Sequence, residues 1–573
     1  MKILKLKKND RVYIATVVCF VLLMFVTNVS ANCSQYIWLI TNNLVGVAVT
    51  FMMLSIYPIR DFLKPFYIIW TFLGIGATIG GFYFWYTHQV GNLLYEWTTV
   101  PLNIWFLGAV VFKFIEEVFI RKSFKVALSK WEFVFVPCML LMLISSSNTV
   151  WPLYYLIIFF LLWHTPFSKR QKNSALIGMI DGILLGVIIL QAWAFFFSPY
   201  LEVRYTGIYG NCNRTACLYL VILAALIGKR HIYRITHESE SLNCKEKKDN
   251  TIRIIDWIMA LVFAFIYYTG SRTGMLGAVL IMLINYYFSE HRFFRHGIRK
   301  LIVKSLAYLA MTVVIIPFLY FPIRYIPEVT QFAKIAAKNL LLGREESYQP
   351  VGGVGFSEAV TNPVIRLFER NRSVADDGED IPDVDKTSDV GDSEEKTDNI
   401  EIEHDASGKY YNLVYEFKYY PERGTYTTKV PRIIYPGILS VDYRVSIAAA
   451  LIDQMNLTGH LDDEVIMRIR SDVPNAYEVY SNNEQNYIIH YLYVYGVPIG
   501  ILVIILMISE MVYLIRRSLS GRSDGTIWLL LISVYFIYGL TEIVWVPGQI
   551  EQLLLFFAPL FFEKYDSCVI AEK

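Results

Sequence analysis

The sequence predicts an all-α polytopic membrane protein, with roughly 12 to 14 membrane-spanning helices and one large extracytoplasmic loop of mixed structure between the eleventh and twelfth spans. Of the 573 residues, 55% are hydrophobic and only 18% are charged, which is unlike a set of soluble domains of this length. Apolar stretches of about 20 residues, enough for a helix to cross a bilayer, recur on both sides of a single hydrophilic region. Basic residues concentrate in alternate loops, as the positive-inside rule requires of cytoplasmic loops.

The apolar stretches divide the chain into three parts. We expect an N-terminal bundle of about 11 spans at 1–320, an extracytoplasmic loop domain at 321–485 and a C-terminal part of about 3 spans at 486–573. Several stretches are shorter than about 20 residues, which is why the expected number is a range. The predicted spans are 12–31, 35–57, 66–87, 96–119, 132–147, 150–166, 174–199, 214–229, 253–269, 273–289, 301–320, 486–514, 526–543 and 549–563.

The charges of the loops predict the orientation. With both chain termini in the cytoplasm, the loops IRKSFKVALSK, SKRQK, GKRHIYR, HRFFRHGIRK and IRRSLSGR all face the cytoplasm. The exceptions on the other side are Arg204, Arg214 and Arg272, each beside a predicted helix end. A single arginine at such a place often only extends its side chain to the membrane interface. Three of them in two short loops call for a further reason.

The N-terminus and the cysteines give two further expectations. The start MKILKLKKNDR and a possible cleavage site at residues 29–31 resemble a secretory signal, but the apolar run exceeds the usual ~7 to 15 residues. We therefore expect a retained first helix. None of the seven cysteines falls between 321 and 485, so the exported segment has no disulfide framework.

The hydrophilic segment is not uniform along its length. Residues 373–406 are acidic and poor in aromatic residues, which is typical of a disordered tract. Aromatic and β-branched residues with turn residues at 409–436 predict a β-hairpin. Helical apolar spacing at 438–455 predicts a helix that packs on the membrane face.

The first polar constellation is RYTGIYGNCNRTACLYL, at the start of the eighth span. Because that helix runs inward, its N-terminus carries free backbone N–H groups and the positive end of its dipole toward the outside. With Arg204, Arg214, Asn211 and Asn213, this place suits an anion. Alternatively, Asn213 and Thr215 only cap the helix.

The second constellation is TGSRTGMLG, at the turn before the tenth span. Ser271 or Thr273 can cap that helix, which also begins on the outer side, and the glycines allow a ligand to approach the backbone. Arg272 then projects from a second positive helix terminus. Two such termini with one guanidinium each can bind a diphosphate, because Arg offers paired donors that match phosphate oxygens.

These motifs, followed by DYRVSIAAALIDQMNLTG in a long outer loop and QNYIIHYLYVYGVPIG before the last spans, resemble the O-antigen ligase and O-antigen polymerase superfamily of polytopic membrane proteins. The resemblance covers roughly residues 174–545, in the order of that family. Its members join sugars outside the membrane, with an oligosaccharide linked through diphosphate to undecaprenol as donor, and need no cofactor or metal. The resemblance therefore implies the cytoplasmic (inner) membrane of a bacterium, with a chain-length regulator and a flippase of the same pathway as further partners.

The resemblance also implies roles for single residues. Arg204 and Arg272 would bind the donor diphosphate and stabilise its charge as it leaves. Arg444 matches an arginine ahead of an N-P-x-x-G-x-G-like stretch, which is reduced here to NLTGH. Gln485 and Asn486 stand where ligases of the family have His-Asn, and that histidine helps to activate the acceptor hydroxyl.

Glutamine cannot act as a general base, so another group is expected to do so. Glu484 is adjacent, His490 lies about one helical turn further on and His460 lies in the loop. A single histidine at the start of a span is more often structural. We expect Glu484 or His490 to take the proton, with no metal involved.

Two further patterns have simpler interpretations. Asp383 and Asp385 form the D-x-D of metal-dependent glycosyltransferases, but such triplets arise by composition in an acidic tract. Lys113, Glu116 and Glu117 near the inner end of the fourth span mark either a polar pathway or a set of ion pairs at the interface.

The function that these observations favour is that of a polysaccharide polymerase, which transfers an undecaprenyl-diphosphate-linked glycan to a lipid-linked repeat unit of an O-antigen, capsule or exopolysaccharide. The close alternative is ligase-type transfer of the finished glycan to another acceptor, and the missing histidine favours the polymerase. An alternative of another class is a lipid-linked oligosaccharide flippase, which would place charges in the middle of the membrane. Nothing in the sequence has the character of a nucleic-acid-binding protein.

Overall fold

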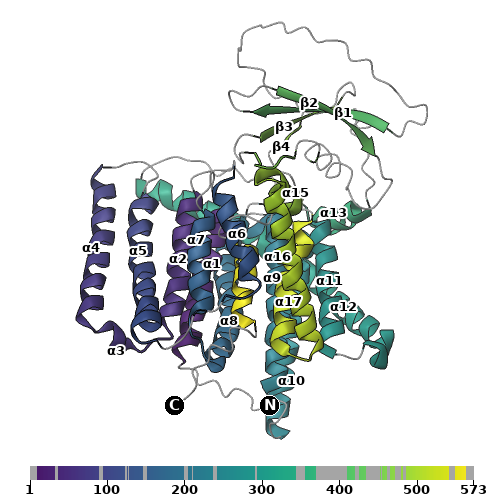
Figure 1. Cartoon of the computed structure of the whole chain (residues 1–573). Coiled ribbons are helices and arrows are strands. Elements are labelled where there is room, and N and C mark those ends of the chain that lie inside the picture. Colours follow the sequence, from purple (N-terminus) through teal and green to yellow (C-terminus); the bar gives the residue numbers. More distant parts are fainter. Residues whose placement is uncertain are drawn as a thin grey trace.

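The molecule is a bundle of helices with a small β-sheet over one end (Figure 1). The computed structural model describes residues 10–32, 37–88, 94–122, 126, 128–145, 151–198, 200, 204–209, 211–236, 242–290, 293–342, 355–368, 410–419, 425–433, 452, 455–460, 465–471, 479–481, 486–540 and 549–562. The acidic tract at 373–406 lies outside the described residues, and so does most of the helix predicted at 438–455.

Each predicted span overlaps a helix of the bundle. The helices are α1 (Arg11–Asn32), α2 (Ile37–Leu54), α3 (Ile59–Phe62), α4 (Pro65–His88), α5 (Leu94–Ile115), η2 (Glu116–Ile120), α6 (Glu132–Leu143), α7 (Trp151–His164), α8 (Lys169–Phe197), η3 (Gly207–Tyr209), α9 (Cys212–Thr236), α10 (Leu242–Tyr268), α11 (Arg272–Glu290), α12 (Phe293–Leu342), α13 (Phe356–Phe368), α15 (Tyr487–Val494), α16 (Val497–Leu519), α17 (Ser523–Gly539), α18 (Ile550–Phe557) and η5 (Ala558–Phe561).

Among the described residues, eight helices are long and apolar enough to cross a membrane. They include α1, α8, α9 and α16, and most of the other predicted spans coincide with shorter apolar helices such as Glu132–Leu143 and Trp151–His164. The chain is therefore a helical protein of the membrane type. One boundary differs from our expectation, because α12 does not end near residue 320 but continues to Leu342 with three internal prolines.

Glycines allow the first and seventh predicted spans, α1 and α8, to pack closely together. Gly178, Gly182 and Gly186 recur every four residues on one side of α8. A Cβ atom at Gly178 would stand 2.7 Å from the backbone oxygen of Tyr13, and one at Gly182 would stand 2.7 Å from that of Val17. Small residues at this spacing let two membrane helices approach closely without a hydrophobic driving force.

The two ends of the bundle differ in their charges and contacts. One end carries η3 and the first turns of α9 and α11; we call it the site end. Asn28, in the last part of α1, donates a hydrogen bond to the backbone oxygen of Ile208 there at 3.1 Å. The other end, which we call the basic end, therefore carries the first turn of α1, with Arg11. Lys229 near the end of α9 pairs there with Asp181 of α8.

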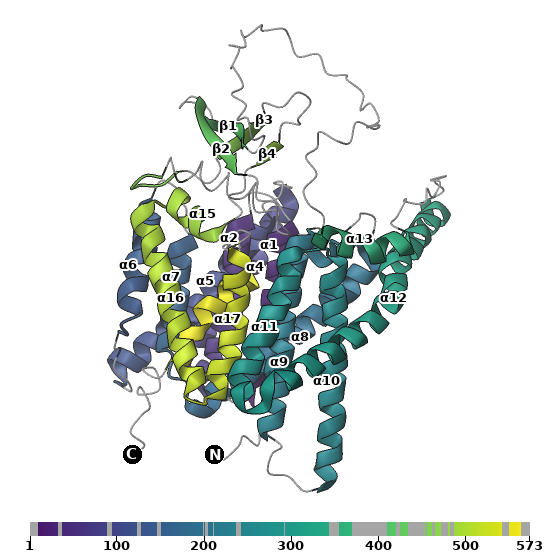
Figure 2. The same ribbon diagram turned by 90° about the vertical axis from the view of Figure 1, so that its right-hand side faces the viewer.

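The sheet lies beyond the site end, above α15 and α13 (Figure 2). Its strands are antiparallel neighbours in the order β2-β1-β3-β4, and β1 pairs with β2 from Tyr410 opposite Ile433 to Lys418 opposite Thr425. The hairpin predicted at 409–436 is thus confirmed. The strands are β1 (Tyr410–Tyr419), β2 (Thr425–Ile433), β3 (Val465–Ser471) and β4 (Val479–Ser481).

The charged residues of the fourth predicted span pair with one another. The side chain of Lys113 is 0% exposed, and its Nζ lies 2.6 Å from Asp61 Oδ2, 3.1 Å from Glu116 Oε2 and 3.3 Å from Glu117 Oε1. Three acids and three bases take part, so their formal charges cancel. Of our two interpretations, ion pairing at the interface therefore describes the structure. We call this set the ionic cluster: Asp61, Lys64, Lys113, Glu116, Glu117 and Arg121.

Candidate functional site

Arg204 joins the two polar constellations of the sequence. Its Nε donates a hydrogen bond to the backbone oxygen of Thr269 at 2.9 Å, and its Nη2 donates to Asn213 Oδ1 at 2.7 Å. The adjacent backbone N–H of Tyr205 donates to the backbone oxygen of Tyr268 at 2.8 Å. The loop before α9 is thereby fixed to the loop before α11. An arginine has five N–H donors, so the remaining ones can still reach a ligand.

The first turn of α9 is capped by Asn211. Its Oδ1 accepts hydrogen bonds from the backbone N–H groups of Asn213 at 2.9 Å and Arg214 at 3.2 Å. The capping alternative for this motif is therefore realised, but by Asn211 rather than by Asn213. Arg214 lies in the same first turn and is partly exposed, so that its charge adds to the positive end of the helix dipole.

The first turn of α11 is capped by Ser271. Its Oγ accepts a hydrogen bond from the backbone N–H of Gly274 at 3.2 Å and lies 3.0 Å from the hydroxyl of Tyr538 on α17. Gly270 before it has a φ of +58°, a conformation that favours glycine. Arg272, the first residue of α11, is partly exposed.

The two helix N-termini lie next to each other. A Cβ atom at Gly274 would stand 2.9 Å from the Cβ of Ala216, so the first turns of α11 and α9 approach closely. Free N–H groups, two helix dipoles and guanidinium groups then act on the same region. This arrangement can bind an anion with several oxygens. The predicted residues that the structure brings together are Arg204, Asn211, Asn213, Arg214, Ser271 and Arg272.

A buried acid beneath this region was not predicted from the sequence. Glu551, near the start of α18, is 5% exposed; its carboxylate accepts a hydrogen bond from the thiol of Cys217 and interacts electrostatically with Arg214. Tyr209 of η3 is close to the same groups, and burial, followed by the charge of Glu551, raises the pKa of its hydroxyl. That hydroxyl is buried and has no hydrogen-bond partner among the described residues.

The residues predicted near the start of the twelfth span have separate roles in the described part of the chain. Asn486 caps α15, because its Oδ1 accepts hydrogen bonds from the N–H groups of Ile488 at 2.9 Å and Ile489 at 3.2 Å. Its Nδ2 donates to the backbone oxygen of Leu540 at 3.0 Å. His490 is only 4% exposed. Glu484, Gln485 and Arg444 lie outside the described residues.

The stretch NLTGH packs against the junction of α15 and α16. The backbone N–H of His460 donates to the backbone oxygen of Tyr493, and its ring stacks on the Tyr493 ring with centroids 4.3 Å apart. A Cβ atom at Gly459 would stand 2.1 Å from the backbone oxygen of Val494. A residue without a side chain is therefore needed at position 459 for this contact. The ring of His460 packs on Tyr493.

α17 connects this junction to the arginines. Its Tyr538 contacts Ser271, while Tyr487 of α15 packs on Tyr535 with ring centroids 5.5 Å apart. The starts of α11 and α15 thus contact the same helix.

Within the described residues there is no group of three or more His, Cys, Asp or Glu side chains that could hold a metal ion. Asp383 and Asp385 fall outside that part of the chain. No family model matches this chain, and no curated protein or solved structure is significantly similar to it.

Proposed function

We propose that this protein is a polysaccharide polymerase that transfers a glycan from undecaprenyl diphosphate to a lipid-linked repeat unit on the extracytoplasmic side of a bacterial cytoplasmic membrane. The observation that carries the proposal is the pair of adjacent helix N-termini, each with arginines, which Arg204 ties together through Thr269 and Asn213. The motif order that resembles O-antigen ligases and polymerases supports the same chemistry.

The arginines act on the leaving group in this proposal. As the bond between the sugar and the diphosphate breaks, negative charge grows on the diphosphate oxygens. Donors that are already oriented toward those oxygens lower the barrier without first having to reorganise. Hydrogen bonds of 2.9 and 2.7 Å fix the planar guanidinium of Arg204, so its remaining donors need little reorganisation to meet those oxygens. The acceptor hydroxyl attacks the sugar, and Glu484 or His490 takes its proton.

The experiment replaces Arg204 and Arg272 in the native host and measures polysaccharide chain length on a gel, with membrane levels checked by blot. Alanine at either position should abolish chain extension, and lysine should rescue poorly because it offers no paired donors. Arg324→Lys is the matched control, because Arg324 pairs with Glu328 at 2.7 Å on α12 and has no proposed role. Wild-type chain lengths from both alanine variants at normal abundance would refute the diphosphate site.

One observation favours the flippase alternative. Glu510 of α16 is 1% exposed, and neither of its carboxylate oxygens has a hydrogen-bond partner among the described residues. Ionisable groups inside a membrane span often mark a transport path. If the protein is a flippase, Glu510→Gln should stop export of the lipid-linked unit; a polymerase should keep normal chain lengths with this variant.

A further inference from the structure

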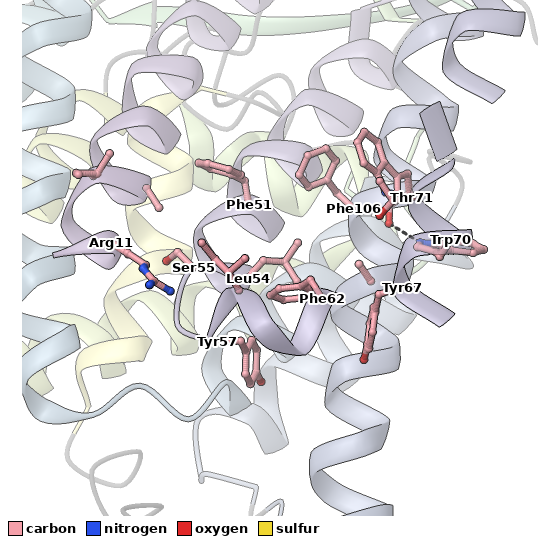
Figure 3. Close-up of a pocket in the computed structure, with 15 residues that line it drawn as sticks. Arg11, Phe51, Leu54, Ser55, Tyr57, Phe62, Tyr67, Trp70, Thr71 and Phe106 are labelled. Carbon is pink, nitrogen blue, oxygen red and sulfur yellow. Dashed lines mark hydrogen bonds between the residues drawn. The ribbon is translucent and has the colours of Figure 1, made fainter. Parts of the chain in front are cut away.

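An apolar pocket lies between two pairs of helices near the basic end of the bundle. Its volume is about 430 Å³, within the range of pockets that hold small ligands. α1 and α2 form one wall and α4 and α5 the other, with α3 below (Figure 3). Phe51, Leu54, Phe62, Trp70 and Phe106 line it, which makes its surface almost entirely apolar.

The walls of the pocket are fixed by specific contacts. The indole N–H of Trp70 on α4 donates a hydrogen bond to the backbone oxygen of Trp105 on α5 at 2.9 Å. Each indole lies over a glycine of the opposite helix, because a Cβ at Gly108 would stand 2.5 Å from the Trp70 ring and one at Gly74 would stand 2.2 Å from Trp105. The pair α4–α5 is therefore held at a set distance, and the pocket beside it is built into the fold.

The floor of the pocket is fixed by the ionic cluster. Asp61 belongs to α3 and pairs with Lys113 of α5 at 2.6 Å, which holds the short helix against the end of α5. Tyr57, a lining residue, has its ring 5.1 Å from Lys113 Nζ. Because the acids and bases of the ionic cluster balance, it contributes no net charge to the pocket.

Arg11 is the charged residue of the lining. It is exposed, it lies on the α1 side across from Trp70 (Figure 3), and it forms no ion pair with any described side chain. The neighbouring carboxylate of Asp10 is directed elsewhere: it accepts hydrogen bonds from Ser174 of α8 at 2.8 Å and from the N–H of Val12 at 3.1 Å. Among the residues that the structure describes, this guanidinium therefore has no ion-pair partner, and it stands beside an apolar pocket.

We propose that this pocket binds one anionic phospholipid, with an acyl chain between the helix pairs and the phosphate on Arg11. The apolar lining favours a hydrocarbon chain over a sugar, which would need convergent donors and acceptors. Arg offers paired N–H donors that match phosphate oxygens. The cytoplasmic leaflet, which the basic end faces in the predicted orientation, is the one enriched in anionic lipids. This site is independent of the proposed polymerase.

The test measures lipid retained by the purified full-length protein. Native mass spectrometry in detergent compares phosphatidylglycerol with phosphatidylcholine of the same acyl chains. The wild type should retain one phosphatidylglycerol at least several-fold more often than phosphatidylcholine. Arg11→Gln should reduce the retention of phosphatidylglycerol to that of phosphatidylcholine. Arg60→Gln is the matched control, because Arg60 is an exposed arginine of the adjacent α3 outside the pocket lining.

A second variant tests the pocket rather than the charge. Ala109 is a buried lining residue of α5, and Ala109→Phe should fill the space and reduce the retention of both lipids. Equal retention of the two lipids by the wild type, or a preference that survives Arg11→Gln, would overturn the proposal. Inorganic phosphate at the same concentration should not displace the lipid; if it does, the site binds the anion alone.

Discussion

An arginine that is already anchored can bind an anion with a smaller loss of freedom than a mobile one. Two donors of Arg204 are fixed by Thr269 and Asn213, so the whole planar guanidinium is already oriented before a ligand binds. A lysine at this position could not bind those anchors and the ligand in the same fixed geometry, because its ammonium group is a compact point charge without a planar set of donors. We therefore expect that a positive charge at position 204 is not enough for chain extension.

The contact of Glu551 with Arg214 is predicted to support chain extension. Glu551 interacts with Arg214 and with the thiol of Cys217 beneath the site, and we expect it to hold Arg214 in place. Glu551→Gln keeps the size of the side chain but removes the carboxyl group, and the loss of a hydrogen-bonded contact of about 0.5 to 1.5 kcal/mol corresponds to a roughly 2- to 10-fold loss of chain extension. Chain length on a gel and membrane abundance by blot measure this.

Two further variants separate this role from simple burial of an acid. Glu551→Asp should recover part of the activity because it restores the carboxyl group. Glu510→Gln removes another buried carboxylate, which has no partner among the described residues, and a polymerase should keep its activity. Normal chain length with Glu551→Gln would show that Arg214 does not depend on this acid.

Asp61 should make stability depend on acid pH. The hydrogen bond from Lys113 is the main cause that holds the pKa of Asp61 below its ordinary value of 3.8. The folded state therefore favours the ionised carboxylate, and this stabilisation is present above the unfolded pKa and is lost as the pH falls through the folded pKa. At pH 7, Asp61→Asn should lose about 1 to 3 kcal/mol, because it leaves the buried Lys113 with one fewer partner.

Thermal unfolding in detergent between pH 7 and pH 3 measures this effect. The difference in melting temperature between the wild type and Asp61→Asn should be constant near neutral pH and should shrink as the pH falls below the ordinary value of 3.8. A difference that stays the same down to pH 3 would mean that the carboxylate charge does not contribute.

At the residue scale, the sequence marks the arginines as candidates but does not show what surrounds them. Arg204, Arg214 and Arg272 stood out because they break the charge pattern of the loops, which requires no knowledge of the fold. Glu551 depends on contacts with Cys217 and Arg214, more than 300 positions earlier in the chain, and such contacts cannot be read from spacing. Its only signal was an ionisable residue inside an apolar span.

At the element scale, close packing of α8 on α1 should depend on the absence of a side chain at three positions. A Cβ at Gly182 would stand 2.7 Å from Val17 O and 2.7 Å from Phe20 Cβ. We expect Gly182→Ala to lower stability by about 1 to 3 kcal/mol, because α1 and α8 must separate. The melting temperature of the purified protein in detergent measures it.

Gly80 of α4 provides the opposite case. A Cβ there would meet nothing within 4 Å, so Gly80→Ala should stabilise the helix by about 0.5 to 1 kcal/mol through reduced backbone freedom. Both substitutions make the same chemical change in a helix. If they shift the melting temperature in the same direction, the close contact between α1 and α8 is not what makes Gly182 necessary.

Elements that depend on local pattern were predicted, and those that depend on distant partners were not. Apolar length marked every predicted span, and turn residues between aromatic runs marked the hairpin β1–β2. β3 was missed because it pairs with β1 across about 50 residues of chain, from Val465 opposite Tyr419. The extension of α12 to Leu342 was not predicted, because the predicted span ends at residue 320 whereas the helix continues through Pro322 and Pro327.

At the scale of the whole molecule, the two ends of the bundle differ both in their charged residues and in the elements that they carry. The arginine-bearing N-termini of α9 and α11 are at the site end, and the sheet lies beyond that end (Figure 2). The basic end carries the first turns of α1 and α8 and the last turns of α9 and α16, which hold Arg11, Lys169, Arg170, Arg234, Arg516 and Arg517. From the positive-inside rule we expect the basic end to face the cytoplasm and the site end, with the sheet, to face the other side.

This orientation can be tested with a membrane-impermeant thiol reagent on intact cells. A cysteine introduced by Gly408→Cys, in the hydrophilic segment, should react, and the native Cys244, between the ninth and eighth predicted spans, should be labelled only after the membrane is opened. In the proposed reaction the lipid-linked donor lies outside the cytoplasm, so the arginines can meet it only in this orientation. If Cys244 is labelled in intact cells and the cysteine at 408 is protected, the topology is the opposite of the predicted one. The proposed reaction then loses its basis.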